Sequence, residues 1–406
     1  MVSCVKQTVF LTAALSMLAP RAFAQGAPDP AASARVHIGP LAMTPTLALT
    51  NAGIDKNVFN EPKQASPKSD FTMTVEPKTE LWLHVGRSVV SGSVTEDLVY
   101  YKKYTNQRSA NSSFKVGLLV PLTRLTLRAN AAYLNTRDRP GFEIDLRAKR
   151  RELLYDGSVE LLALSRTSVG VKATRQKVEF ASNEVFLGAN LQNELGRQIM
   201  GEALTLRHQL TPLTTINLDV GRQRDRFESS PLRDSDSRQA NLGVQFDPFA
   251  LLKGGATVGY RDFKPLAPGI PSYQGLTAAV DLTYVALGAT RLSVQAMRDV
   301  QFSFDVNQPY YIQTGVSASL AQQIFGPVDV VGRVGAQQLD YRTRAGAPVA
   351  AAARTDYIRS YGGGVGYHIG KDVRFGFNVD SSRRTSEAAG REYDGFRYGT
   401  AVTYGF

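Results

Sequence analysis

The chain ends in the stretch FRYGTAVTYGF, which runs from Phe396 to Phe406. One parity of this stretch is mainly apolar or aromatic: Phe396, Tyr398, Thr400, Val402, Tyr404 and Phe406. The other parity is polar or small: Arg397, Gly399, Ala401, Thr403 and Gly405. Successive side chains of a strand point to opposite faces, and aromatic residues near both ends are typical of strands that cross a bilayer. The stretch therefore predicts a membrane strand with one face toward lipid and the other toward water.

The same period of two recurs along the chain. It is clearest in residues 125–133, 216–221, 276–284 and 373–380, where apolar residues alternate with polar, charged or glycine residues. A soluble sandwich would also alternate, but it would place fewer charges in the middle of its strands. These segments therefore predict a transmembrane antiparallel up-and-down β-barrel, an all-β fold.

Two kinds of connection alternate between the predicted strands. Short ones are expected near residues 86–87, 121–122, 165–166, 211–212, 248–249, 288–289, 326–327 and 370–371. Longer polar ones are expected near residues 52–69, 104–111, 137–147, 182–195, 229–237, 265–273, 306–309, 344–354 and 386–391. Short periplasmic turns and long extracellular loops are the rule for such barrels, and they predict about 18 strands, within a range of roughly 16 to 18.

The N-terminus resembles a secretory signal. A basic start at Lys6 precedes an apolar run over 8–18, and Ala22 and Ala24 stand two apart before Gln25. The run is too short to cross a bilayer as a helix. We expect a signal peptide over 1–24 with cleavage near Ala24, a short periplasmic segment over 25–43 and the barrel over 44–406. Cys4, the only cysteine, would leave with the signal, so neither disulfides nor cysteine-ligated metal are expected.

The inward parity carries charges of both signs. Candidate lumen-facing charges are Lys115, Arg128, Lys172, Asp219, Asp281, Asp329, Arg333, Arg374, Asp380 and Arg397. Ion-selective pores use rings of one sign, so this mixture indicates an ordinary hydrated wall. A barrel of this size is a channel unless a loop or a domain plugs it, and residues 25–43 are too few for a plug domain.

Basic residues also continue the outward parity toward the long loops. The formal charge of +11 falls to +9 once Lys6 and Arg21 leave with the signal. Candidate contacts to outer-leaflet lipopolysaccharide are Lys149, Arg151, Arg175, Lys177, Arg222, Arg224 and Arg226. Arginine can bind phosphate bidentately, whereas a solvated rim is the alternative. Nucleic acid is not expected as a partner of an exported barrel.

No catalytic or metal pattern is present in the sequence. The histidines His37, His84, His208 and His368 are scattered without ligand spacing, and no nucleophile motif accompanies His208. We therefore expect neither an enzyme nor a cofactor. The run from Gly362 to Gly364 lies within a predicted strand, so it is no phosphate-binding loop.

Several motifs resemble a known family. Gly39-Pro40, the segment from Pro45 to Leu49 and the segment from Asp55 to Phe59 resemble the first strand and loop of outer-membrane β-barrel porins associated with exopolysaccharide gene clusters. Residues 254–263, 375–377, 382–384, 391–395 and 404–406 are similar to later strands of that family. The resemblance implies an outer-membrane channel, in some members for secreted polysaccharide, and a periplasmic export component as a partner.

Three functions other than polysaccharide export stay open at this stage. They are a general diffusion porin for small hydrophilic solutes, a structural or adhesive barrel acting through its loops, and a lipid-modifying enzyme. In each case Phe406 is expected to be the terminal aromatic that the barrel-assembly machinery reads. The final strand should also pair with the first, because a closed barrel has no free edge.

Overall fold

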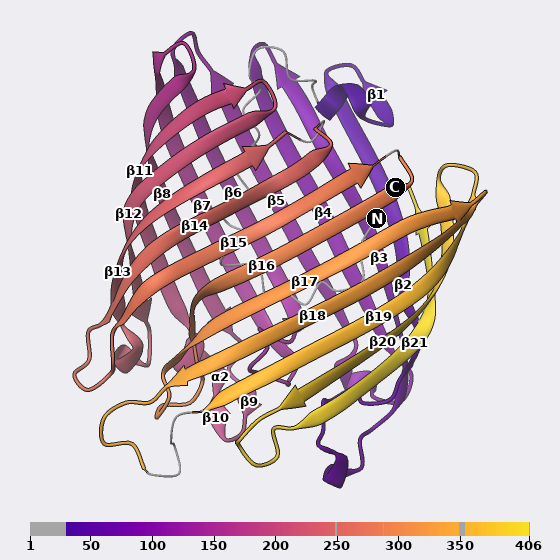
Figure 1. The fold of residues 1–406 in the computed structure, drawn as a ribbon, viewed down its shortest axis with the longest axis vertical. Helices are drawn as coiled ribbons and strands as arrows, with labels where there is room; N and C mark the ends of the chain where they lie inside the picture. The colour runs from indigo at the N-terminus through magenta and orange to yellow at the C-terminus, as the bar shows by residue number, and fades with distance from the viewer. Residues whose placement is uncertain (1–29, 248–249, 287, 349–353, 406) are drawn as a thin grey trace.

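The computed structural model describes residues 30–247, 250–286, 288–348 and 354–405. Eighteen antiparallel strands form a closed barrel, and the short strand β1 (Val36–Ile38) is hydrogen-bonded beside them (Figure 1). The barrel strands are β2 (Leu41–Asp55), β3 (Asp70–Val85), β4 (Ser88–Tyr101), β5 (Ser109–Pro121), β6 (Leu125–Asp138), β7 (Ala148–Leu164), β8 (Thr167–Phe180), β11 (Arg197–Thr211), β12 (Thr214–Phe227), β13 (Ser235–Phe246), β14 (Leu252–Pro265), β15 (Tyr273–Ala286), β16 (Thr290–Phe302), β17 (Tyr310–Phe325), β18 (Val328–Arg342), β19 (Thr355–Ile369), β20 (Val373–Thr385) and β21 (Tyr393–Tyr404). The predicted fold and strand number are confirmed.

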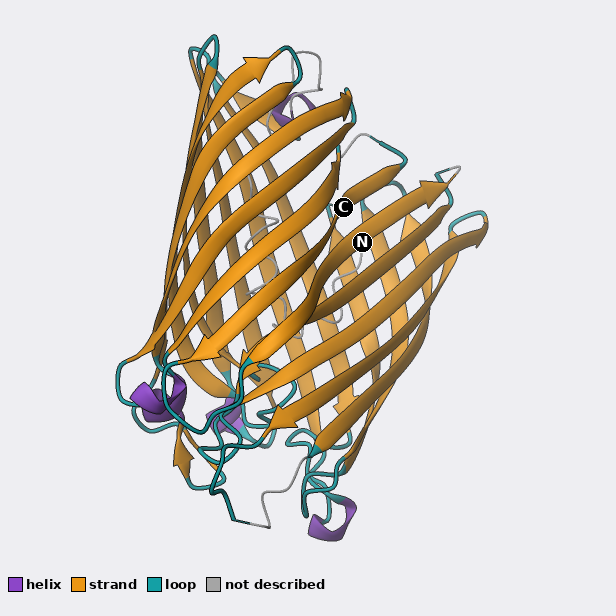
Figure 2. Ribbon diagram, turned by 60° about the vertical axis from the view of Figure 1, so that its left-hand side comes forward, coloured by secondary structure: helices purple, strands orange, loops and turns teal. Residues whose placement is uncertain are grey.

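The short turns and the long loops gather at opposite ends of the barrel (Figure 2). The end with the short turns is called the turn end, and the end with the long loops is called the loop end. The loops contain the only helical elements among the described residues after Ser33: η4 (Lys63–Ala65), η5 (Thr105–Gln107), α2 (Leu191–Leu195) and η6 (Pro231–Arg233), together with the hairpin of β9 (Val185–Phe186) and β10 (Ala189–Asn190). A further turn, η3 (Pro30–Ser33), precedes β1. The predicted alternation of short and long connections is confirmed.

The barrel closes between its first and last strands. Leu47 lies opposite Tyr404 and Asp55 lies opposite Arg397, so β2 and β21 pair antiparallel, as predicted. The register shifts between Leu49 and Ala52, where Asn51 has a φ of 55°. An extra residue in a strand forms a β-bulge, and asparagine tolerates this left-handed conformation better than most residues. The first strand begins at Leu41, three residues before the predicted start of the barrel at Thr44.

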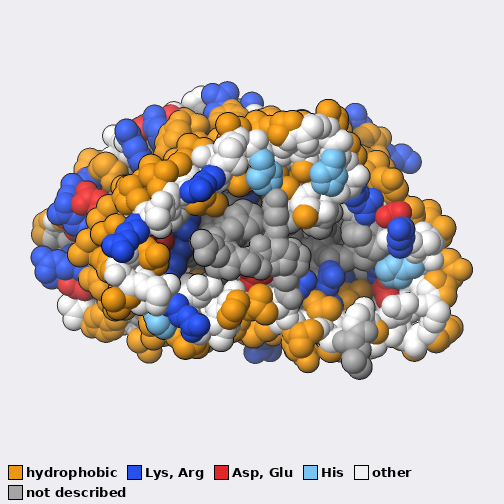
Figure 3. Space-filling model, turned by 90° about the horizontal axis from the view of Figure 1, so that it is seen from above, with side chains coloured by type: hydrophobic (Ala, Val, Ile, Leu, Met, Phe, Trp, Pro, Cys, Tyr) orange, Lys and Arg blue, Asp and Glu red, His pale blue; other side chains and the backbone are white. Residues whose placement is uncertain are grey.

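Each strand turns its apolar parity outward. In the terminal region, Phe375 lies opposite Tyr367, and Phe377 lies opposite Val365, and all four side chains are exposed. Lipid covers such a surface in a barrel of this kind, because only the outward parity meets the bilayer. Hydrophobic side chains ring the outside of the oval opening at the turn end (Figure 3). None of the helices in the described ranges is both long enough and apolar enough to cross a bilayer.

Candidate functional site

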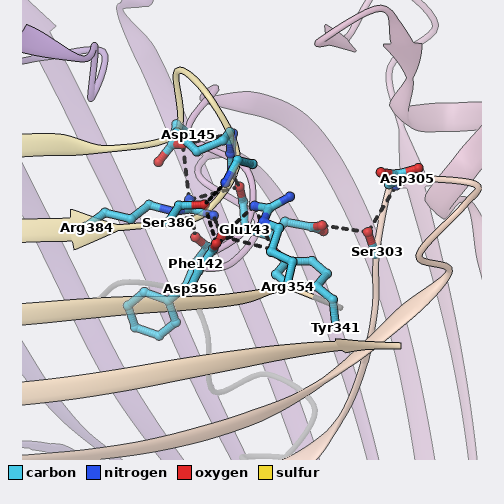
Figure 4. A network of polar contacts seen from close by, with 12 residues as sticks. Phe142, Glu143, Asp145, Ser303, Asp305, Tyr341, Arg354, Asp356, Arg384 and Ser386 are labelled. Atoms are coloured by element: carbon cyan, nitrogen blue, oxygen red, sulfur yellow. Dashed lines mark hydrogen bonds and ion pairs between the residues drawn. The ribbon is translucent and has the colours of Figure 1, made fainter. Parts of the chain in front are cut away.

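The loop over 139–147 crosses the loop end of the barrel. It connects β6 to β7, yet the guanidinium of Arg384 on β20 donates to the carbonyl oxygens of Phe142, at 3.0 Å, and Glu143, at 3.3 Å. Strands β6 and β20 are not neighbours, because β5, β4, β3, β2 and β21 lie between them in the wall. The loop therefore extends across part of the mouth to reach β20, and Figure 4 shows Phe142 and Glu143 beside Arg384.

Arg384 anchors this loop through carboxylates on both sides of it. Its guanidinium pairs with Asp356 of β19 and, at 3.3 Å, with Asp145 of the loop. The side chains of Arg384 and Asp356 are both 0% exposed. Arg354 also binds Asp356, with Nε 2.9 Å from Oδ1, and Arg391 lies 3.2 Å from Asp145. Removal of one partner from a buried ion pair strongly destabilises a protein. The two carboxylates and three arginines therefore stabilise the position of the loop together.

Glu143 points into the interior of the packed loops. The residue is 2% exposed; its Oε1 accepts from Oγ of Ser303 at 2.6 Å and its Oε2 accepts from the amide of Phe304 at 3.3 Å. Burial raises the pKa of the Glu143 carboxyl, against the lowering effect of the Ser303 hydrogen bond and of the nearby Arg391. Glu143 therefore connects the loop over 139–147, called the crossing loop, to the loop over 303–309. Its buried surroundings disfavour the charged form of its carboxyl.

A second buried arginine joins the loops from the other side. Arg233, at the end of η6, donates from Nε to the carbonyl of Ser303 at 2.9 Å and from Nη2 to the carbonyl of Phe304 at 3.0 Å. Its Nη1 pairs with Glu194 of α2. The loops over 181–196, 228–234 and 303–309 are thus connected through one guanidinium.

An apolar cluster fills the space between these polar contacts. Its buried members are Ile144, Ala148, Val178, Phe180, Leu191, Leu195 and Phe304. The ring of Phe304 meets the ring of Phe186 edge to face at 4.9 Å. Burial of aliphatic and aromatic side chains stabilises a packed arrangement, so the loop end contains a small core of its own.

Below this core, the ten candidate lumen charges lie on the parity opposite the exposed apolar side chains. They are Lys115, Arg128, Lys172, Asp219, Asp281, Asp329, Arg333, Arg374, Asp380 and Arg397. Arg333 pairs with Asp380 at 2.9 Å, and Arg374 pairs with Asp329, which also lies 2.6 Å from His368. Most of the remaining candidates are separated around the wall. The structure thus brings some of them into opposite-charge pairs and gathers no ring of one sign from them.

Inward charges that the sequence did not identify as candidates form further ion pairs. Arg128 lies 2.6 Å from Glu160, which also lies 3.3 Å from Arg207. Nearer the loop end, Arg261 lies 2.8 Å from Asp299. A small cavity of about 120 Å³ opens beside this pair and is also lined by Lys172, Arg197 and Asp225. The alternation of apolar and polar residues in the sequence could have identified these charged residues as inward-facing. It could not have identified which residue of another strand each one pairs with.

The seven candidate lipopolysaccharide contacts lie in the half of the wall nearest the loop end, on the exposed apolar parity: Lys149, Arg151, Arg175, Lys177, Arg222, Arg224 and Arg226. Several form ion pairs on that outer face, such as Arg222 with Glu202 at 2.6 Å and Arg226 with Asp236 at 2.6 Å. Phe406, the predicted assembly signal, lies outside the described residues. Within those residues no three histidines, cysteines or carboxylates lie together as a metal site.

Comparisons with known proteins extend this description. The family described as Putative beta-barrel porin 2 matches residues 29–406. Among solved structures, OccK9 (OpdG) of Pseudomonas aeruginosa is 11% identical, covering 89% of this chain and 97% of its own, with a TM-score of 0.45. A BenF-like porin of Pseudomonas fluorescens Pf-5 is 10% identical, with 89% and 98% covered and a TM-score of 0.47. No curated protein matches.

Proposed function

The chain belongs to the putative beta-barrel porin 2 family, and from this premise we propose that it carries polysaccharide across the outer membrane through a mouth governed by the loop over 139–147. The chain is an outer-membrane β-barrel porin, and the export of polysaccharide is the finer step that we add. The resemblance to porins associated with exopolysaccharide gene clusters supports this substrate. The proposal includes no catalytic step and no cofactor.

The observation that carries the proposal is a set of uncharged amide side chains that lie flat on the lumen wall. Several inward asparagine and glutamine side chains lie across a glycine of the neighbouring strand. Any residue larger than glycine at that position would place its Cβ against the amide. A Cβ on Gly259 would lie 1.9 Å from Oδ1 of Asn241, and one on Gly315 would lie 1.8 Å from Oε1 of Gln337. Asn378 lies over Gly364 in the same way, with 2.3 Å from its Oδ1 to the added Cβ.

This arrangement suits a hydroxyl-rich polymer. Amides both donate and accept hydrogen bonds, as sugar hydroxyls do, and they hold no charge that would trap a passing chain. Conduction needs binding that is weak enough for release at each site. Because the charges of the wall are largely paired, they add little preference for ions of one sign.

Two measurements test the proposal. Deletion of the gene should lower the amount of secreted polysaccharide, and complementation with the intact gene should restore it; unchanged secretion would count against the export role. In planar bilayers, fragments of the secreted polymer should block the current transiently. Replacement of Asn241 and Asn378, which are both partly exposed, by alanine should shorten the blocks, whereas replacement of the outward Gln274 should leave them unchanged.

A general diffusion porin for small hydrophilic solutes is the second candidate, because the same hydrated wall would admit them. Such a porin should conduct steadily, pass small sugars at rates set by their size, and show no blocks with polymer. That result, together with normal secretion in the deletion strain, would favour the second candidate over the first.

A further inference from the structure

A groove of about 1070 Å³ runs along the outer surface of the barrel over β6–β8 and β11–β14. Its lining includes two successive rows of outward side chains. The lower row comprises Val171, Leu204, Val220, Ala240 and Tyr260, which lie opposite one another in the strand registers. The upper row, nearer the loop end, comprises Ala173, Glu202, Arg222, Arg238 and Asp262. The groove thus has an apolar side and a charged side.

The lower row is a surface for hydrocarbon. Leu204 is 64% exposed and Val220 is 51% exposed, although both are aliphatic. In a membrane barrel the outward apolar band meets acyl chains, and charged side chains are tolerated only toward the interface. The groove therefore lies at the boundary between the acyl chains and the headgroups of the outer leaflet.

Above the groove, basic side chains outnumber acidic ones. The next row toward the loops reads Arg175, Met200, Arg224, Asp236 and Lys264. Together with the upper row it holds five basic side chains and three acidic ones. All three acidic side chains are paired: Glu202 with Arg222 at 2.6 Å, Asp262 with Lys264 at 3.1 Å and Asp236 with Arg226 at 2.6 Å.

Three arginines remain available for a ligand: Arg238 in the upper row of the groove, and Arg175 and Arg224 in the next row toward the loops. Among the described residues, Arg175 bonds to an amide, Gln198, at 3.2 Å, and Arg224 comes no closer than 4.0 Å to a carboxylate, that of Glu202. Arg238 lies directly opposite Arg222 on one adjacent strand and opposite Asp262 on the other, where Lys264 already binds the Asp262 carboxylate at 3.1 Å. Like charges that face each other across strands repel, so an anion between them would be stabilising.

The spacing of these arginines suits a ligand with separated phosphates. Arg224 and Arg238 are diagonal neighbours on adjacent strands, about 7 Å apart at their Cβ atoms. Arg175 and Arg224 flank Met200 on the strand between them, which separates them by about 10 Å. Arginine side chains are long, so two of these guanidinium groups can bind one phosphate between them. Alternatively, each guanidinium can bind a separate phosphate through two parallel hydrogen bonds.

We propose that this groove is a binding site for lipopolysaccharide, with the phosphates of its lipid anchor on Arg175, Arg224 and Arg238 and its acyl chains on the lower row. The occupant follows from the two sides of the groove, because a bisphosphorylated glycolipid presents hydrocarbon directly beneath its phosphates. The site lies on the outside of the wall and is independent of what passes through the lumen.

Native mass spectrometry of the delipidated, refolded barrel tests the proposal, with bisphosphorylated lipid A as the probe. The wild-type barrel should retain lipid A, and the Arg175→Gln/Arg224→Gln/Arg238→Gln variant should bind it about tenfold or more weakly, because charge-assisted bonds are lost. The matching lysine variant keeps the positive charges but loses the bidentate geometry, so its affinity should lie between those of the wild type and the glutamine variant. The control Arg359→Gln/Arg383→Gln removes two exposed outward arginines that face each other on β19 and β20, and it should change nothing.

Three results would overturn the proposal. They are wild-type affinity in the triple glutamine variant, equal affinity for dephosphorylated lipid A, and displacement of lipid A by inorganic phosphate. The last would indicate a site for free phosphate instead of a lipid. If the triple variant fails to refold, Arg224→Gln alone should weaken binding in the same direction, and wild-type affinity in that variant would be equally decisive.

Discussion

The two ends of the barrel connect the same strands in different ways. At the turn end, the chain reverses over a few residues, and glycines with positive φ, such as Gly86 and Gly370, make no contact that a Cβ would disturb. At the loop end, loops from different strand pairs meet over buried arginines and a shared apolar cluster. This difference indicates that the turn end only connects the strands of the wall, whereas the packed loop end is where we propose that access to the lumen is controlled.

The largest expected effect comes from the chain terminus, whose last described strand ends at the turn end. We expect Phe406→Asp to reduce insertion severely, since a charge replaces the terminal aromatic that the assembly machinery is proposed to read. Immunoblots of outer-membrane fractions would measure this. Phe396→Asp is an informative comparison at the other end of the same strand; normal membrane levels of the Phe406 variant would contradict the proposed role.

Removal of the crossing loop should produce the next largest effect. Replacing residues 140–146 by a short glycine-serine linker should raise single-channel conductance several-fold, because it removes the segment that extends across part of the mouth. Removal of residues 63–66, an exposed tip of another loop, is the matched control and should leave conductance near that of the wild type. Equal conductance in all three proteins would show that the crossing loop does not obstruct the channel.

Arg384→Met should loosen the loop end without removing any backbone. The substitution removes the partner that Asp356 and Asp145 share, but Arg354 and Arg391 still pair with them. We therefore expect a cost below that of a buried charge left without any partner, which is about 3–5 kcal/mol. Hydrogen exchange over 139–147 should become faster, with little change in the strands. Arg383→Met, one residue earlier and facing outward with 68% of its side chain exposed, should have no such effect.

A substitution at the turn end should affect stability alone. Gly370 has a φ of 61° and open space around it, so Gly370→Val should cost about 1–2 kcal/mol through the left-handed backbone. Unfolding in urea, followed by gel mobility, would measure the loss. Gly332→Ala, at a position with similar space and without a positive φ, should be nearly neutral. A change in conductance in the valine variant would break the proposed division between the two ends.

The smallest expected effect is a change in pH dependence at Glu143. Because burial raises the pKa of this carboxyl, the packed loop binds the proton more tightly than a released, solvated loop does. Packing is therefore favoured at low pH and is weakened as pH rises from the ordinary value of 4.5 through the raised one. Conductance should increase over that window in the wild type.

Comparison with Glu143→Gln isolates this carboxyl from Asp145 and Asp356. The glutamine variant should lose the component of the pH profile that Glu143 contributes, and the exposed Glu392→Gln should retain it. Identical pH profiles of conductance for the wild type and Glu143→Gln would show that Glu143 does not contribute to the pH dependence.

The wall could be predicted from sequence because its rule is local. A period of two, broken by turns such as Gly370-Lys371, sets the strands, and closure then fixes the pairing of β2 with β21. The packed mouth could not be predicted in the same way. Its contacts join Phe142 and Arg384 across a separation of 242 residues. Phe142 and Ile144, apolar residues within a loop assumed to be polar, were the available hint that this loop folds inward.

A reversible bridge between the crossing loop and its neighbour tests the central claim most directly. Glu143→Cys and Ser303→Cys, introduced where the two side chains touch, can be joined by a short thiol-reactive cross-linker in a barrel whose single cysteine, Cys4, is replaced by serine. Loop-governed access predicts that the bridged barrel stays at low conductance and that reduction of a cleavable bridge restores openings. Identical currents before and after reduction would contradict it.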